Sequence, residues 1–280
     1  MHVVSAGPTD GTPVMLLHGF PEFWYGWRHQ IAALSAAGFR VYVPDQRGYN
    51  ESDRPARVSA YHLDDLCADV LDIMDHLGLE RMRIVGHDWG AVVLWELATR
   101  HPERVDRQVI LNVPHLSVML RTLKRNWRQI QKSYYVYFFQ LSSIAETVLR
   151  KDNYRALVKA LRSTSKRHSF SSADLVEYRR AWAQPGALTG MLNWYRCVVR
   201  DNLRYLIVKP ELPRIRVPTL ILWGARDVAL ELSMAHESMA LCERGRLIVF
   251  DDATHWIQHD EPDAVNRHLI AFLKPDMPNA

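Results

Sequence analysis

Residues 82–93 read Met-Arg-Ile-Val-Gly-His-Asp-Trp-Gly-Ala-Val-Val, and this stretch decides the fold. An apolar run at 82–85 is followed by a small residue, any residue, a nucleophile, any residue and a small residue, and then by a helical pattern. That is the layout of a nucleophile elbow, a sharp strand-to-helix turn that exposes a reactive side chain. Its central residue here is Asp88, a carboxylate where a hydroxyl is usual. The stretch therefore predicts an α/β sheet with a carboxylate nucleophile at a strand end.

The residues around Asp88 also have a predicted task. A sharp turn crowds its flanks, and Gly86 and Gly90 avoid side-chain collisions there. The turn leaves the backbone N–H of Trp89 at a helix N-terminus, where it can hold a developing anion. A second donor is expected from the N–H of Phe20, in the stretch His-Gly-Phe-Pro that follows another apolar run.

Short apolar runs recur along the chain and are typical of parallel strands covered on both faces. They lie at residues 14–17, 41–43, 84–85, 109–111, 219–222 and 247–250. Helical patterns separate them; in 62–77 the apolar positions keep i, i+3, i+4 spacing, and Gly78 supplies a C-terminal stop. This alternation predicts a mostly parallel, doubly wound α/β sheet with right-handed crossovers.

The alternation of strands and helices stops between about 115 and 212, a stretch rich in helix formers, aromatic residues, Arg and Lys. We interpret residues 115–212 as a helical cap inserted between two strands of one core domain, formed by 1–114 and 213–280. Five basic residues of the cap fall near helical spacing and predict a solvated helix face, with an anion or partner patch as the alternative. They are Arg121, Lys124, Arg125, Arg128 and Lys132.

The composition is that of an ordinary globular protein of 280 residues, with 48% hydrophobic and 24% charged residues. A net charge of +4 does not by itself argue for a nucleic-acid partner. Cys67, Cys197 and Cys242 show neither metal spacing nor a disulfide framework, so we expect reduced thiols that pack as small apolar groups. With no secretory signal and no apolar run near the roughly 20 residues of a membrane span, a cytoplasmic location is expected.

Polar side chains follow two later strands, at the sheet edge where ligands bind in such folds. Asp227 follows the run at 219–222, and His255 follows the last strand. Asp251 and Asp252 compete with Asp227 as the partner of His255, although we expect them to stay solvated. Two histidines near the predicted site are interpreted as structural: His18 and His87.

Together and in order, these motifs resemble those of the α/β-hydrolase-fold epoxide hydrolases, over essentially the whole chain. The matching stretches are His-Gly-Phe-Pro-Glu at 18–22, Asp-Gln-Arg-Gly-Tyr at 45–49, Gly-His-Asp-Trp-Gly at 86–90, Trp-Gly-Ala-Arg-Asp at 223–227 and Thr-His-Trp at 254–256. The resemblance implies that Asp88 is the nucleophile and that Asp227 and His255 form the charge-relay pair. One departure is Asn50, where the family more often has glycine, but asparagine tolerates the left-handed conformation better than most residues.

The resemblance also implies two cap tyrosines that hold and protonate the epoxide oxygen. Tyr195 fits one position, within Asn-Trp-Tyr-Arg at 193–196. Tyr135 fits the other best, in Tyr-Tyr-Val-Tyr-Phe-Phe-Gln at 134–140, and Tyr134 and Tyr137 remain alternatives. From the residues alone, these tyrosines would be interpreted as core residues with bonded hydroxyls.

A carboxylate suits attack on a saturated epoxide carbon because it is ionised at neutral pH, with an ordinary pKa of about 3.9. Attack by Asp88 would form an alkyl ester while Tyr135 and Tyr195 protonate the leaving oxygen. His255, oriented by Asp227, would then activate water to release a vicinal diol. The expected partners are a small apolar epoxide and water, with no metal, organic cofactor or nucleic acid, in a monomer or homodimer that serves detoxification or a defined metabolic step.

Two other functions compete with this one. A haloalkane dehalogenase uses the same nucleophile, and the indole of Trp89 could hold a halide. The acidic hydroxyls of Tyr135 and Tyr195, and Phe20 where an amide would help a halide, favour the epoxide. The other competitor is a binding protein that has lost catalysis, and an intact triad argues against it.

Overall fold

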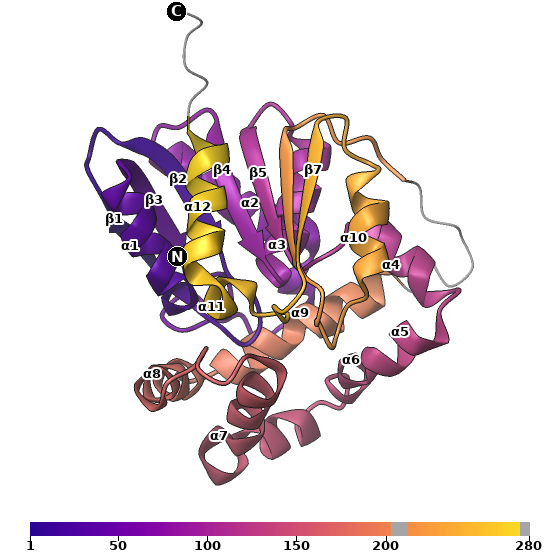
Figure 1. Cartoon of the computed structure of the whole chain (residues 1–280). Coiled ribbons are helices and arrows are strands. Elements are labelled where there is room, and N and C mark those ends of the chain that lie inside the picture. The colour runs from indigo at the N-terminus through magenta and orange to yellow at the C-terminus, as the bar shows by residue number, and fades with distance from the viewer. Residues whose placement is uncertain (203–211, 275–280) are drawn as a thin grey trace, which may run out of the picture.

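The computed structural model describes residues 1–202 and 212–274, and its centre is a seven-stranded sheet in the order β1-β3-β2-β4-β5-β6-β7 (Figure 1). β1 pairs with β3 antiparallel and the other neighbouring strands are parallel. The strands are β1 (Val3–Ala6), β2 (Thr12–Leu17), β3 (Phe39–Pro44), β4 (Met82–His87), β5 (Val105–Leu111), β6 (Thr219–Gly224) and β7 (Gly245–Phe250). The prediction of a mostly parallel α/β sheet is confirmed. Only β1 was not predicted, because this four-residue edge strand is half exposed and carries no clear apolar pattern.

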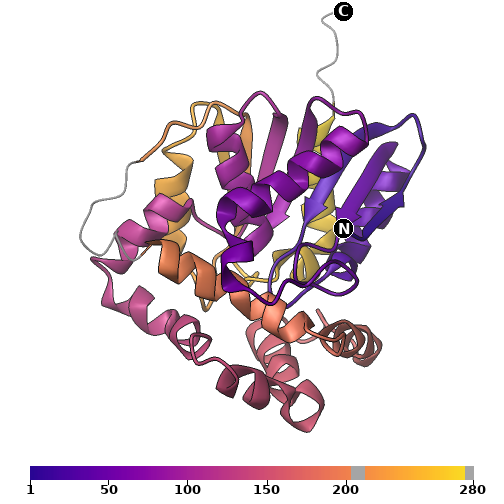
Figure 2. The ribbon, with the colours of Figure 1, turned by 180° about the vertical axis from the view of Figure 1, so that it is seen from behind.

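Helices cover both faces of the sheet, and the alternation of side chains along each strand divides the core into two layers. In β2, Val14 and Leu16 pack into one layer, whereas Met15 and Leu17 pack into the other. The first layer lies in front of the sheet in Figure 1, and Figure 2 brings the second layer forward. The covering helices are α1 (Arg28–Ala36), α11 (Ile257–Asp260) and α12 (Pro262–Leu273) on the first face, and α2 (Leu63–His76), α3 (Trp89–Arg100) and α10 (Leu232–Met239) on the second.

The predicted helix at 62–77 is confirmed to within one residue at each end as α2. Its buried residues Leu66, Val70 and Met74 follow helical spacing and face α3 and the sheet. Asp64 and Asp65 lie in the first turn, where carboxylates favour the positive end of the helix dipole. Gly78 adopts φ +68° just beyond the end, as a helix stop requires.

The chain between β5 and β6 forms helices in its described part, as predicted. They are α4 (Leu116–Leu123), α5 (Trp127–Lys132), α6 (Tyr134–Phe138), α7 (Ile144–Thr164), which is interrupted by non-helical backbone at 151–154, α8 (Ser172–Trp182) and α9 (Ala187–Asn202). Two short 3-10 helices precede them in the chain, at Trp24–Trp27 and Val58–Tyr61. The Trp182 indole donates to the carbonyl of Pro21, after β2, and the Trp194 indole to that of Arg47, after β3. Helices α5 to α9 therefore lie across the C-terminal ends of the strands, at the bottom of Figure 1.

The basic residues of this segment do not share one helix face, which corrects the expectation of a single solvated face. α4 ends before Lys124 and α5 begins at Trp127, so the basic residues are divided between two helices and a turn. Arg121 pairs with Glu237 and the ammonium of Lys132 lies 3.9 Å from Glu231. The interruption of the helix at 124–126 was not predicted, because the spacing of apolar residues in the sequence does not mark it.

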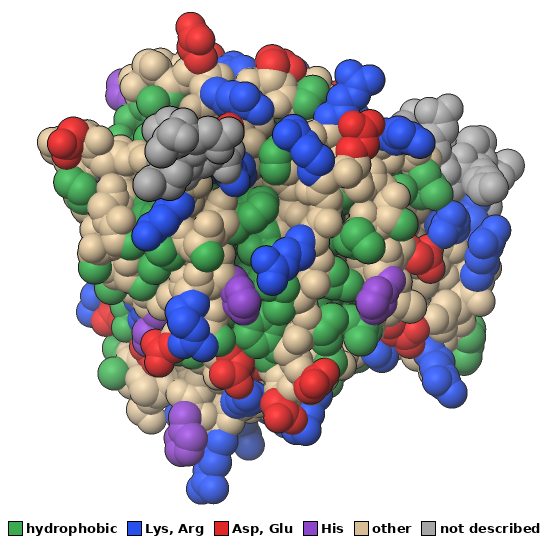
Figure 3. Space-filling view, turned by 45° about the horizontal axis from the view of Figure 1, so that its top comes forward, with side chains coloured by type: hydrophobic (Ala, Val, Ile, Leu, Met, Phe, Trp, Pro, Cys, Tyr) green, Lys and Arg blue, Asp and Glu red, His purple; other side chains and the backbone are tan. Residues whose placement is uncertain are grey.

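Within the described ranges, no helix combines the length and the apolar character that crossing a bilayer requires. On the face shown in Figure 3, Lys and Arg side chains are scattered and acidic side chains lie among them. A nucleic-acid backbone is usually met by a continuous basic stripe, and this face does not carry one.

Candidate active site

Asp88 sits at the turn between β4 and α3 with φ +50° and ψ −122°, a backbone conformation that few non-glycine residues adopt. Its carbonyl accepts hydrogen bonds from Ala91 (2.9 Å) and Val92 (3.1 Å), which start α3 immediately. A Cβ on Gly86 would lie 2.6 Å from the carbonyl oxygen of Gly90, so the tight turn needs glycine. The predicted elbow is confirmed, including the crowding that its glycines relieve.

The carboxylate of Asp88 is held between a backbone amide and a histidine. The N–H of Phe20 donates to Oδ1 at 2.6 Å, and Nε2 of His255 lies 3.6 Å from Oδ2. Phe20 precedes a cis peptide bond to Pro21. The N–H of Trp89, at the first position of α3, has no preceding helical turn to supply a carbonyl. Both amides that the sequence predicts as oxyanion donors thus lie beside Asp88.

His255 pairs with Asp227, and the alternative partners lie elsewhere. Nδ1 of His255 is 2.7 Å from Oδ2 of Asp227, while Oδ1 of Asp227 accepts from the backbone N–H groups that follow at 229 and 230. Asp251 and Asp252 are exposed, and Asp252 pairs with Arg226. The predicted order of Asp88, Asp227 and His255 along the chain thus becomes one group in space, in which His255 is hydrogen-bonded to Asp227 and lies 3.6 Å from Asp88.

Asn112 also belongs to this group, a role that sequence reasoning did not give it. Its Nδ2 donates to Oδ2 of Asp227 at 2.9 Å, and its Oδ1 accepts from the N–H of Gly224 at 2.9 Å. Asn112 adopts φ +49° directly after β5, and β5 lies beside β6 in the sheet. The sequence shows only a polar residue at the end of a strand. Its hydrogen-bond partner could be identified only once the order of the strands in the sheet was known.

Burial and mutual charge set the ionisation of these groups. Burial alone would raise the pKa of Asp88, but hydrogen bonding and charge from His255, with the N–H of Phe20, leave the pKa below its ordinary value. The pKa of Asp227 is lowered in the same way, against its burial, by His255 and Asn112. Burial would lower the pKa of His255, yet the two carboxylates outweigh burial and raise it. The resting site therefore favours an ionised Asp88 and a protonated His255.

Two tyrosines from the inserted helices face Asp88. Tyr195, on α9, packs edge-on against Trp89 with ring centroids 4.9 Å apart, and Tyr135, on α6, lies 5.9 Å from Tyr195. Burial, followed by the charge of Asp88, raises the pKa of both hydroxyls, so both keep their protons. Of the alternatives to Tyr135, Tyr134 is 72% exposed and Tyr137 is 59% exposed. The structure therefore brings Tyr135, and neither alternative, next to Tyr195.

A buried polar network supports the loop of His255 from behind. Nε2 of His87 lies 2.9 Å from the backbone oxygen of His255. Glu22 is enclosed by His259, at 2.7 Å, and by the hydroxyl of Tyr178 on α8, which donates at 2.5 Å. The sequence pointed to Glu22 only as part of a motif, because its partners are 156 and 237 residues away.

Comparison with known proteins identifies the family of this fold. The family model described as alpha/beta hydrolase fold matches residues 12–262. The AB hydrolase superfamily protein YfhM of Bacillus subtilis is 42% identical, over 98% of this chain and 94% of its own length. Epoxide hydrolase 4 of Mus musculus is 37% identical, over 98% of this chain and 76% of its own length.

Among solved structures, an inhibitor complex of the Bacillus megaterium epoxide hydrolase superposes with a TM-score of 0.89 at 30% identity and covers 97% of this chain and 96% of that one. A variant of the same hydrolase was crystallised with its product, (R)-3-[1]naphthyloxy-propane-1,2-diol. A carboxylate elbow, a His–Asp pair and likeness to epoxide hydrolases over almost the full length lead to one conclusion: this chain belongs to the epoxide hydrolases of the α/β-hydrolase fold.

Proposed function

We propose that this chain hydrolyses epoxides to vicinal diols through a covalent ester on Asp88. The observation that carries the proposal is the position of Asp88, which has His255 within 3.6 Å and two tyrosines, the partly buried Tyr135 and the buried Tyr195, close enough to respond to its charge. This arrangement places a base and two proton donors around the nucleophilic carboxylate of Asp88. The epoxide hydrolases among the relatives support the same reaction.

In the first step, Oδ2 of Asp88 attacks an epoxide carbon, so that an O–C bond forms and the C–O bond of the ring breaks. The ring oxygen takes a proton from a tyrosine, Tyr135 or Tyr195. Hydroxyls whose pKa is raised hold that proton at neutral pH and donate hydrogen bonds to the epoxide oxygen. Asp88 needs no base, because its lowered pKa keeps it ionised.

The second step uses a change in charge that the first step makes. When Asp88 becomes a neutral ester, His255 loses one of the two carboxylates that raise its pKa. Its pKa falls, so the ring can give its proton to the tyrosinate left by the first step and act as the base while Asp227 keeps it oriented. Water then attacks Cγ of Asp88 and gives one proton to His255, which passes it to the departing diol oxygen. The second proton of the water returns His255 to its protonated resting form as the carboxylate of Asp88 is restored.

The tetrahedral intermediate of this second step places its negative charge on Oδ1 of Asp88. The N–H of Phe20 already donates to that oxygen at 2.6 Å, and the N–H of Trp89 is the second donor that we assign. One such donor contributes about 2.7–4 kcal/mol to the transition state.

The arrangement of the chain fits a core and a cap. We assign residues 1–114 and 213–280 to the core domain and residues 115–212 to the cap, which carries both tyrosines. The three cysteines are free, which fits the reducing cytoplasm that we propose as the location of the protein.

We propose an apolar, aryl-bearing epoxide as the substrate. Phe20, Trp89, Phe139 and the two tyrosines form a continuous group of aromatic rings beside Asp88, with neighbouring centroids 4.9–5.9 Å apart. The product bound by the Bacillus megaterium relative carries a naphthyl group, which supports the same class.

One observation favours haloalkane dehalogenation as a second candidate. Nε1 of Trp89 is buried and meets no acceptor at full hydrogen-bond geometry among the described residues, although it acts on the nearby Tyr195 hydroxyl, so it could donate to a halide. A halide needs no proton, however, and the two tyrosines beside the nucleophile supply the proton that only an epoxide oxygen requires. We therefore rank the epoxide first.

Turnover of styrene oxide tests the proposal. Wild-type protein should convert it to the diol, and Asp88→Asn should lose activity by about a thousandfold or more, because an amide cannot open the ring. Asp251→Asn is the matched control, since this exposed carboxylate is near the site in sequence only. Wild-type protein that binds styrene oxide without hydrolysing it would favour the binding-protein alternative.

A further inference from the structure

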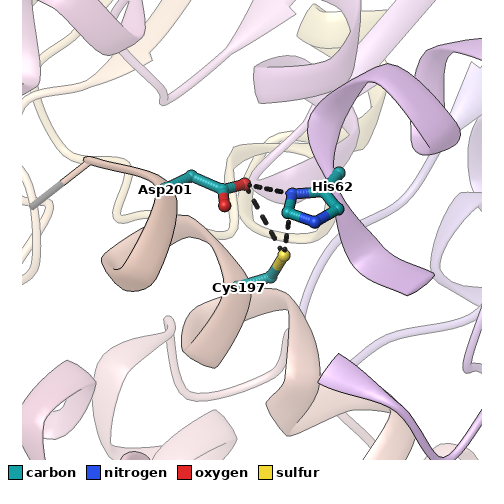
Figure 4. Close-up of side chains that lie close together, drawn as sticks. All are labelled: His62, Cys197 and Asp201. Atoms are coloured by element: carbon teal, nitrogen blue, oxygen red, sulfur yellow. Dashed lines mark hydrogen bonds and ion pairs between the residues drawn. The ribbon is translucent and has the colours of Figure 1, made fainter. Parts of the chain in front are cut away.

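Three potential metal ligands converge beside a cavity that Trp89 and Trp194 also line. His62 immediately precedes α2, while Cys197 and Asp201 are one turn apart on α9, and Figure 4 shows their side chains pointing toward one another. Sγ of Cys197 lies 3.6 Å from both Nδ1 of His62 and Oδ2 of Asp201. The group could not be predicted from local sequence patterns, because His62 and Cys197 are 135 residues apart.

The distances from the sulfur match a tetrahedral zinc site. With Zn–S near 2.3 Å and Zn–N or Zn–O near 2.1 Å, tetrahedral angles place sulfur about 3.6 Å from each of the other ligand atoms. The third edge, between Nδ1 and Oδ2, is 2.8 Å because these atoms are hydrogen-bonded. It would open by about 0.6 Å in a tetrahedral site, and both side chains have room to move, since His62 is 47% exposed and Asp201 33% exposed.

Access for an aqueous ion comes from a neighbouring cavity of about 370 Å³, which His62 and Asp201 both line. Cys197 is buried and does not line the cavity itself. The ligands therefore combine a buried thiol with two groups that reach solvent, and water in the cavity can fill the fourth position of the metal.

The same three residue types could form a nucleophilic thiol, but the geometry argues against that. Cys197 and Asp201 both approach Nδ1 of His62, so the ring is not placed as a bridge between acid and thiol. Burial, together with the charge of Asp201, raises the pKa of Cys197 to about 12, which disfavours a free thiolate. A divalent cation reverses this effect, because it releases the thiol proton and neutralises the carboxylate.

We propose that Nδ1 of His62, Sγ of Cys197 and Oδ2 of Asp201 bind a zinc-class divalent cation. This metal takes no part in the hydrolysis proposed above. It links the start of α2 to α9, the helix that carries Tyr195, and so fixes an inserted helix to the helical layer behind the sheet. The proposal does not depend on the reaction at Asp88.

Cobalt(II) is the probe, added to reduced, metal-free protein, because a bound thiolate gives a sulfur-to-cobalt charge-transfer band in the near ultraviolet. We expect one cobalt per chain and displacement of the cobalt by zinc. Cys197→Ser, His62→Gln and Asp201→Asn should each weaken binding at least tenfold, and Cys197→Ser should abolish the band. Cys242→Ser and Cys67→Ser are the matched controls, which remove the other two thiols and should leave the band unchanged.

Thermal unfolding supplies a second readout that needs no thiol signal. Zinc at a hundredfold excess over its Kd should raise the Tm of wild-type protein by about 5 °C or more, and should raise that of Asp201→Asn much less. Asp201 is partly exposed, so this variant tests the site even if Cys197→Ser fails to fold. A band that survives in Cys197→Ser, or the absence of any band and any zinc-induced shift in wild-type protein, would overturn the proposal.

Discussion

His255 lies between two carboxylates, and this position determines how the site responds to pH. Its ring is 2.7 Å from Asp227 and 3.6 Å from Asp88, and together the carboxylates raise its pKa above the ordinary 6.5. The ion pairs therefore contribute their full stability below pH 6.5, and this contribution is lost as pH rises through the raised pKa of the folded state. On the acid side, Asp88 and Asp227 have lowered pKa values, so their contribution is lost as pH falls below about 3.8.

Asp88→Asn should lower the pKa of His255, because it removes one of the two charges, as the ester would. NMR titration of the imidazole resonances measures the change, and His255→Gln identifies the resonance by its loss. Asp252→Asn, an exposed carboxylate that pairs with Arg226, is the control and should leave the titration unchanged. An unaltered pKa in Asp88→Asn would show that esterification does not prepare the base.

At the scale of elements, the strands and α2 were predictable because their patterns are local. Apolar runs and the Gly78 stop are determined by neighbouring residues, and the structure places both as expected. The short edge strand β1 and the separation of α4 from α5 were not predicted, since the first lacks an apolar pattern and the second is marked only by Asn126, whose side chain caps the start of α5. The turn between β4 and α3 was also predictable, because steric crowding there requires glycine at Gly86 and Gly90.

Gly90→Ala should destabilise the protein more than Gly78→Ala. A Cβ at Gly90 would overlap the backbone of Leu17 and His18, whereas a Cβ at Gly78 meets no atom within 4 Å and suffers only from φ +68°. The conformational cost at Gly78 is about 1–2 kcal/mol, and Gly90→Ala should exceed it. Urea unfolding followed by circular dichroism compares the two variants; equal losses would contradict the crowding at the elbow.

At the scale of the whole molecule, contacts between residues far apart in the sequence determine which side chains form the active site. The chain order of Asp88, Asp227 and His255 was enough to predict the group, because parallel strands end at one edge of the sheet. Asn112 and Glu22 were not predictable in their roles, since their partners are assigned by strand order and by contacts with the inserted helices. Glu22 joins the two parts of the chain through the hydroxyl of Tyr178 on α8.

Tyr178→Phe should cost about 1.5–3 kcal/mol of unfolding free energy, the contribution of a hydrogen bond to a buried charge. Tyr25→Phe is the matched control, because Tyr25 is only partly buried and its partner Asp174 also pairs with Arg28, so the loss of this hydroxyl should cost less. Differential scanning calorimetry measures both. A Tyr178→Phe variant as stable as wild type would contradict the role of Glu22 in joining the inserted helices to the sheet.

The most direct test of the central claim is to trap the ester on Asp88. His255→Gln lacks the base of the second step, so mixing it with styrene oxide should add the mass of one epoxide to the intact protein, and peptide mapping should place it on Asp88. A 1-bromoalkane serves as the parallel reagent, and the double variant with Asp88→Asn as the control that takes up nothing. An adduct from the bromoalkane alone would identify a dehalogenase, and no adduct on Asp88 from either reagent would contradict the covalent route.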